Sequence, residues 1–203
     1  MKRMIDRIDA LREAFNIGIG RGASALGCMT GSHVRLNVIH LKMISPDALE
    51  DEKGELGEVP MSCVQLPFEG NISGVAELVF PASSAGKFVT ALTHDMPDMR
   101  GIDSIRASTL REIGNVVLNA VMGTISNFFT LNFVYSLPRY AEGDFDSLLP
   151  SSVASPETTV ALARTHFNIE NLQVDGMIMV FFAIGATERL LETIGAQDRV
   201  VKP

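Results

Sequence analysis

The chain contains 203 residues, of which 46% are hydrophobic and 20% are charged, with a formal net charge of −7. This composition predicts a globular protein that buries a sizeable core, and the acidic balance argues against nucleic-acid binding. No apolar run approaches the roughly 20 residues of a membrane span, and the charged N-terminus lacks the features of a signal peptide, so we expect no membrane insertion.

The first half of the chain is predicted to begin with a long helix at about residues 5–30 and to end with a short helix at about 83–94. Between them, the alternation of β-branched and polar residues predicts three strands. We expect these strands at 34–44, 58–68 and 72–80, with an Asp-, Glu- and Gly-rich loop at about 45–57.

The second half is predicted to have the same order, from a long helix at about 103–129 to a short helix at about 186–195. Its strands are expected at 130–137, 157–167 and 172–182. A serine- and proline-rich loop is expected at about 141–156.

The two halves therefore read as an internal repeat of helix, three strands and helix. In both, a glycine (Gly74, Gly176) is followed six residues later by a phenylalanine (Phe80, Phe182). One half alone would leave an apolar sheet face uncovered, so we expect a shared sheet. The sequence predicts an α+β fold with pseudo-two-fold symmetry, in a single domain over 1–203 with half-repeats at about 5–95 and 103–196.

A polar pattern occurs once in each long helix. It consists of an Asp or Ser, then a Glu four residues later and an Asn three residues after that. The first triplet is Asp9, Glu13 and Asn16, and the second is Ser108, Glu112 and Asn115. On a helix these spacings lie within about 60° of one another, so each triplet forms one face. A solvated helix surface would explain one triplet, but its recurrence 99 residues later favours a shared function.

The remainder of each helix predicts packing. Opposite the second triplet lies an apolar face, consisting of Leu110, Ile113, Val117, Val121, Thr124 and Phe128. The first helix has glycines at 18, 20 and 22, which predict a close backbone approach to the sheet or to the partner helix. We disfavour a phosphate-binding loop there because no strand precedes these glycines.

Other chemistry-bearing residues form no recognisable site. The histidines (His33, His40, His94 and His166) are scattered along the chain, and no metal cluster accompanies the triplets. The cysteines, Cys28 and Cys63, fit no disulfide framework or zinc motif, so we expect a reduced, cytoplasmic protein.

The triplets resemble the motif of the CheC/CheX/FliY family of phosphatases, which dephosphorylate the chemotaxis response regulator CheY. That motif is Asp or Ser, three residues, Glu, two residues, Asn, 22 residues and Pro. The second copy is complete and ends at Pro138, whereas the first has Ile39 at the proline position. Two copies resemble CheC more than the single-site CheX, and the lack of a switch domain after residue 195 argues against FliY.

The resemblance implies two long helices on one face of the sheet and two candidate sites. Asn115 and Asn16 would hold an attacking water in line with phosphorus, and Glu112 and Glu13 would pair with a lysine of the regulator. Ser108, Asp9 and Pro138 would support the motif, with Pro138 shaping the strand behind the helix. The resemblance implies no cofactor of the protein's own, because Mg²⁺ would be carried by the regulator.

Two other functions stay open at this point. A CheC-like chain could act mainly as an adaptor that binds the receptor deamidase CheD. It could also be a structural component of the flagellar switch.

Overall fold

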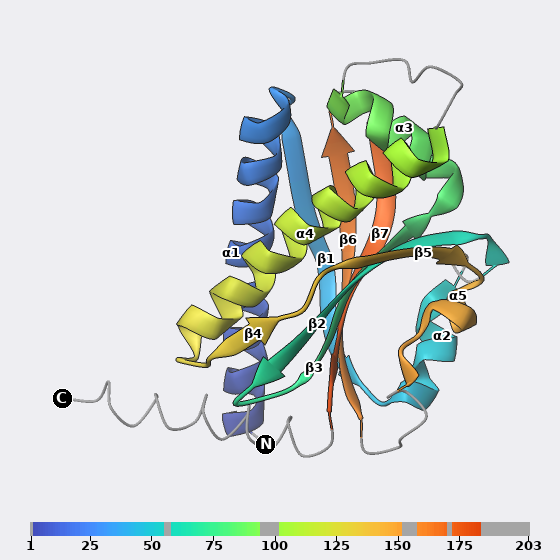
Figure 1. The fold of residues 1–203 in the computed structure, drawn as a ribbon. Coiled ribbons are helices and arrows are strands. Elements are labelled where there is room, and N and C mark those ends of the chain that lie inside the picture. Colours follow the sequence, from blue (N-terminus) through green and yellow to red (C-terminus); the bar gives the residue numbers. More distant parts are fainter. Residues whose placement is uncertain (1, 55–57, 94–101, 152–157, 170–171, 184–203) are drawn as a thin grey trace.

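The computed structural model describes residues 2–54, 58–93, 102–151, 158–169 and 172–183 (Figure 1). The short helix predicted at about 186–195 lies outside the described residues. Within the described part of the chain, no helix is both long and apolar enough to span a membrane.

The first half contains the predicted elements, and β1 has the predicted bounds. In chain order they are α1 (Lys2–Thr30), β1 (Val34–Ile44), β2 (Met61–Gly70), β3 (Gly74–Pro81) and α3 (Ala82–Thr93). The loop predicted at about 45–57 is wrong in part, because it contains the 3₁₀ helix η1 (Pro46–Ala48) and the short helix α2 (Leu49–Lys53). Proline at the first position of η1 suits a helix start, and buried Leu49 anchors α2 to the core.

The described part of the second half is also as predicted, apart from its first strand and the loop that follows it. Its elements are α4 (Ile102–Phe128), β4 (Phe133–Tyr135), β5 (Arg139–Gly143), α5 (Phe145–Leu148), β6 (Thr159–Ile169) and β7 (Leu172–Phe182). The strand predicted at 130–137 is only three residues long as β4, and pairing with β2 resumes as β5. The loop predicted at about 141–156 is wrong in part, because it contains the end of β5 and the short helix α5. Pro138 lies in the interruption, where its missing N–H removes a ladder donor.

All strands form one antiparallel sheet with the order β1-β6-β7-β3-β2-β4, in which β5 also pairs with β2. β3 and β7 are neighbours at the centre, and Glu77 pairs there with Met179, 102 residues further along the chain. An added Cβ on Gly74 would overlap the Phe181 carbonyl oxygen, and one on Gly176 would lie 2.8 Å from the Val79 carbonyl oxygen. The two glycines therefore allow the same close approach, which is consistent with the predicted pseudo-two-fold.

The helices α1 and α4 pack against each other on one face of this sheet and run in opposite senses (Figure 1). A Cβ on Gly18 would lie 2.6 Å from the Cα of Val121, and one on Gly22 would lie 3.3 Å from the Cα of Val117. The predicted close approach is thus confirmed at these two glycines, and the partner is the other helix. Gly20 has no heavy atom within 4 Å of its added Cβ, so the prediction is wrong there.

Most of the predicted apolar face of α4 is buried, but Phe128 at its C-terminal end is 41% exposed. Ile125 and Phe129 are buried in the core at this end instead, so the buried face passes through these two residues and not through Phe128. On the opposite face of the sheet, a second cluster gathers around residues of α2 and α5, including Leu49, Phe145 and Leu148.

Candidate functional site

The first triplet lies on the outward face of α1. Asp9, Glu13 and Asn16 are all exposed, whereas the neighbouring Leu11 and Phe15 are fully buried. Asp9 accepts a hydrogen bond from Arg12 at 3.1 Å, in an exposed pair that contributes little stability. Within the described part of the chain, no cation pairs with Glu13, and no group is hydrogen-bonded to the side chain of Asn16. This carboxylate and this amide are available to a partner.

The second triplet lies on the outward face of α4. Ser108 and Glu112 are exposed and Asn115 is half-buried. The Ser108 hydroxyl donates to the Ile105 carbonyl oxygen at 2.9 Å, so it is engaged with its own helix. Among the described residues, Glu112 has no cationic partner. Directly beside the triplet, a Cβ on Gly114 would lie 2.5 Å from the Cβ of Val64, so α4 contacts β2 through its backbone at this point.

The fold keeps the two triplets apart. Each lies on the N-terminal side of the contact between Gly18 and Val121 on its own helix. Because α1 and α4 run in opposite senses (Figure 1), the two triplets lie toward opposite ends of the helix pair. The structure therefore presents two separate candidate sites.

The two proline positions of the motif occupy similar places in the sheet. The register of β1 on β6 shifts by one residue between Val38 and His40, at Ile39. The pairing of β2 shifts by one residue between Tyr135 of β4 and Arg139 of β5, across Pro138. Ile39 is 62% exposed and lies in the edge strand. The strand irregularity is thus present in both halves, with or without proline.

The sequence analysis missed one neighbour of the second triplet, Asn119. Its Nδ2 donates to the Asn115 backbone oxygen at 2.8 Å and to Asn115 Oδ1 at 2.6 Å. The spacing of four residues was a readable signal, because side chains at i and i+4 meet on a helix. The position 99 residues earlier is Gly20, which has no side chain to offer.

It also missed a buried polar pair at the centre of the sheet. Glu77 is fully buried, and its Oε1 accepts a hydrogen bond of 2.7 Å from Gln65, while Oε2 has no hydrogen-bond partner among the described residues. Burial raises the pKa of Glu77 to about 8, against the hydrogen bond from Gln65, and burial also raises the pKa of neighbouring Cys63. A single carboxylate in an otherwise apolar strand, GVAELVFP, was the available signal.

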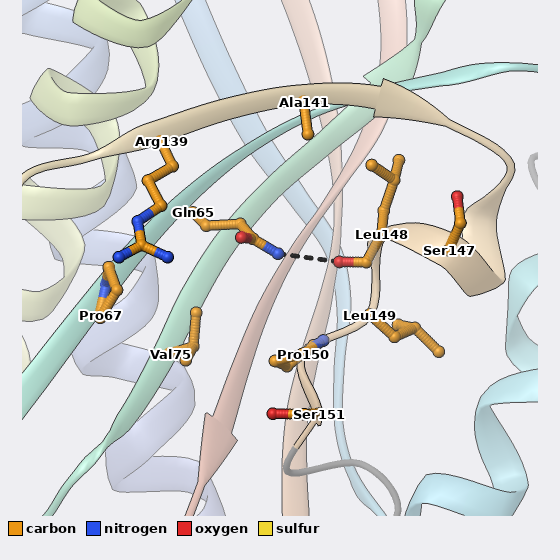
Figure 2. A pocket seen from close by; sticks show the side chains of 10 residues that line it. All are labelled: Gln65, Pro67, Val75, Arg139, Ala141, Ser147, Leu148, Leu149, Pro150 and Ser151. Carbon is orange, nitrogen blue, oxygen red and sulfur yellow. Dashed lines mark hydrogen bonds between the residues drawn. The ribbon is translucent and has the colours of Figure 1, made fainter.

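The sheet face that carries Gln65 also borders a pocket of about 370 Å³ beside α5 (Figure 2). Gln65 donates to the Leu148 carbonyl oxygen at 2.8 Å there, and Arg139 supplies the guanidinium drawn at its rim. No residue of either triplet lines this pocket. It lies across the sheet from α1 and α4, so it is separate from the candidate sites.

Comparison with known proteins reveals similarity in both sequence and fold, although no protein-family model matches the chain. The chain is 28% identical over 148 residues to the CheY-P phosphatase CheC of Bacillus subtilis (strain 168), which covers 71% of this chain and 70% of that protein. FliY of Thermotoga maritima has a similar structure, with a TM-score of 0.72 and 18% identity over 94% of this chain and 96% of that chain. The CheX-CheY-BeF3-Mg²⁺ complex of Borrelia burgdorferi contains another, with a TM-score of 0.52 and 14% identity over 87% and 98% of the respective chains.

The two structural similarities show that this α+β fold, with one antiparallel sheet, is the fold of FliY and CheX. Together with the sequence match to CheC, they confirm the predicted resemblance to the CheC/CheX/FliY family.

Proposed function

We propose that this protein hydrolyses the aspartyl phosphate of a phosphorylated CheY-like response regulator. The observation that carries the proposal is the presence of two Glu–Asn pairs on the outward faces of equivalent helices, Glu13 with Asn16, both exposed, and exposed Glu112 with half-buried Asn115. The sequence match to a CheY-P phosphatase supports it. We place the activity in the cytoplasm, since Cys28 and Cys63 are both free thiols.

An acyl phosphate is already labile, so the phosphatase has mainly to position the reactants. An Asn side chain, with two donor hydrogens and an acceptor oxygen, can hold a water close to phosphorus. As the water oxygen bonds to phosphorus, the bond from phosphorus to the aspartate oxygen breaks. Inorganic phosphate leaves, the aspartate becomes a free carboxylate, and the water's proton passes to solvent. The Mg²⁺ of the regulator would neutralise charge on the phosphoryl oxygens.

In this proposal, Glu112 and Glu13 dock the regulator. Neither carboxylate has a cationic partner among the described residues, so each is free to pair with a lysine at the phosphorylation site. The net charge of −7 gives little long-range attraction to an acidic regulator pocket. Recognition should therefore favour the Mg²⁺-loaded, phosphorylated regulator, whose local charge differs from that of the free form.

The direct test is the release of inorganic phosphate from a labelled, Mg²⁺-loaded response regulator, with and without this protein. We expect faster release in its presence. Release at the regulator's own rate, with intact binding, would refute the phosphatase proposal and favour an adaptor or a switch component.

Docking is tested separately with Glu112→Gln and a regulator carrying beryllofluoride in place of the phosphoryl group. To isolate the second site, the measurement is made with Glu13→Gln already present. Glu112→Gln should weaken binding, and more strongly at low salt, where screening is least. The matched control is Glu58→Gln, which removes an exposed charge outside both helices. Equal losses in the two variants would contradict docking through this helix face.

A further inference from the structure

The hydrogen bonds of Asn119 fix which way the side-chain amide of Asn115 points. Asn119 Nδ2 has two hydrogens, and each has its own acceptor, the backbone oxygen and Oδ1 of Asn115. A helix carbonyl only accepts, so the Asn119 atom that faces it must be the nitrogen. That nitrogen then requires an acceptor as its second neighbour, which must be Asn115 Oδ1 rather than Nδ2. Among the described residues nothing accepts a hydrogen bond from Asn115 Nδ2, so both of its N–H groups are left for a partner.

In the described part of the chain, the first site has no side chain that orients its asparagine in this way. The residue equivalent to Asn119 is Gly20, and among the described residues nothing is hydrogen-bonded to the side chain of Asn16. The amide of Asn16 is therefore free to present either its oxygen or its nitrogen. Gly20 is exposed, and an added Cβ there would have no heavy atom within 4 Å. A side chain at this position is sterically permitted.

We propose that Asn119 is a positioning residue, which holds the Asn115 amide with its N–H groups outward and so makes the second site the faster of the two. The inference rests on the proposed function. A water held by an N–H donor contributes one lone pair to that hydrogen bond and keeps the other for phosphorus. An amide already fixed in this orientation loses less rotational freedom when the water binds, so the gain appears in the chemical step.

The test in the second site uses Asn16→Ala as background, so that only Asn115 contributes turnover. Adding Asn119→Ala should lower kcat by about five- to tenfold, the scale of one net hydrogen bond, and leave KM unchanged. Asn119→Asp offers only acceptors, so it should draw the N–H groups of Asn115 inward and lower kcat at least as far. Unchanged kcat in both variants would overturn the proposal.

The reciprocal test introduces the equivalent of Asn119 into the first site, in an Asn115→Ala background. Gly20→Asn should raise kcat by a similar factor over Gly20→Ala, the control for the change in helix propensity. Equal rates for the two Gly20 variants would count against positioning by the second amide.

A third readout does not depend on turnover. In the ¹⁵N–¹H spectrum, the side-chain amide of Asn115 should be ordered in the Asn16→Ala protein and mobile after Asn119→Ala. An Asn115 amide that is equally ordered in both proteins would refute the orientation. Absence of turnover in the wild-type protein would refute the proposed function and with it the effect on rate, and the amide signals would still decide whether Asn119 holds Asn115.

Discussion

Phe15 in α1 and Gly114 in α4 occupy equivalent positions, 99 residues apart, yet they fill the space near the sheet differently. Phe15 is a large, fully buried side chain, whereas Gly114 brings the backbone of α4 against Val64 of β2. Where the two helices contact each other, α1 contributes the smaller residue, Gly18, and α4 contributes the larger one, Val121. The halves share one pattern of buried positions, and their side-chain volumes complement each other across the helix pair.

The two halves also differ in the polar residues within the sheet and beside the triplets. Glu77 with Gln65 in the first half corresponds to Met179 with Leu162 in the second, since both pairs lie directly opposite in the sheet. Beside the triplets, Asn119 in α4 corresponds to Gly20 in α1. The Glu and Asn of the triplets are present in both halves, although their surroundings differ. A functional constraint on the helix faces predicts that the Glu and Asn are the same in both halves while the residues around them differ.

The largest effect is expected at the buried carboxylate that only the first half carries. Burial raises the pKa of Glu77 from 4.5 to about 8, so the native state keeps a proton that the unfolded chain releases. Its contribution to stability is fully present below about pH 4.5 and is lost as the pH rises through about 8. The loss is on the order of 5 kcal/mol at most. Glu77→Gln should flatten this dependence.

Urea unfolding between pH 4 and pH 9 measures that difference. Glu69→Gln, an exposed glutamate in the neighbouring strand β2, is the control and should behave as the wild-type protein. The same pH dependence in Glu77→Gln and Glu69→Gln would show that Glu77 ionises normally in the fold.

The next effect separates two glycines of α1. Gly18→Ala places a methyl group against the backbone at Val121 and should cost about 2 kcal/mol, a typical penalty for overpacking. Gly20→Ala meets nothing and should stabilise the helix by up to about 1 kcal/mol. The measurement is the urea midpoint at constant m-value. Equal stability of the two variants would contradict the close helix contact at Gly18.

The smallest effect is expected at the proline position of the first motif. Because Ile39 is exposed, at a register shift in an edge strand, Ile39→Pro should change stability by less than about 1 kcal/mol. The control is Val64→Pro in β2, which is paired on both sides and should be strongly destabilised. In an Asn115→Ala background, Ile39→Pro should leave phosphate release by the first site unchanged. A clear gain would show that Ile39 limits this site.

Local patterns in the sequence predicted the regular elements well and their interruptions poorly. Strands 34–44 and 172–182 have the predicted bounds, and both are rich in the β-branched, aromatic and other apolar residues that favour strands. The break between β4 and β5 depends on pairing with β2, a long-range contact that the segment around Pro138 does not encode by itself. The short helices α2 and α5 have too few residues for a helical period to appear.

The candidate residues could be predicted because the triplets recur, but their surroundings could not. That Gly18 and Gly22 contact α4 while Gly20 does not depends on where the helices cross. The burial of Glu77 depends on β3 lying at the centre of the sheet, which only the strand order reveals. The spacing of four residues predicts the hydrogen bond from Asn119 to Asn115. A search for recurring residues does not find it, because the equivalent position in the first helix is Gly20.

The central claim is that both helix faces carry out hydrolysis through their asparagines. The most direct measurement is phosphate release from a phosphorylated regulator by the wild-type protein, Asn16→Ala, Asn115→Ala and the double variant, with regulator binding measured in parallel. Each single variant should keep part of the activity, with the larger loss in Asn115→Ala, and the double variant should lose about 10²-fold with binding retained. A double variant that still hydrolyses at the wild-type rate would contradict the account.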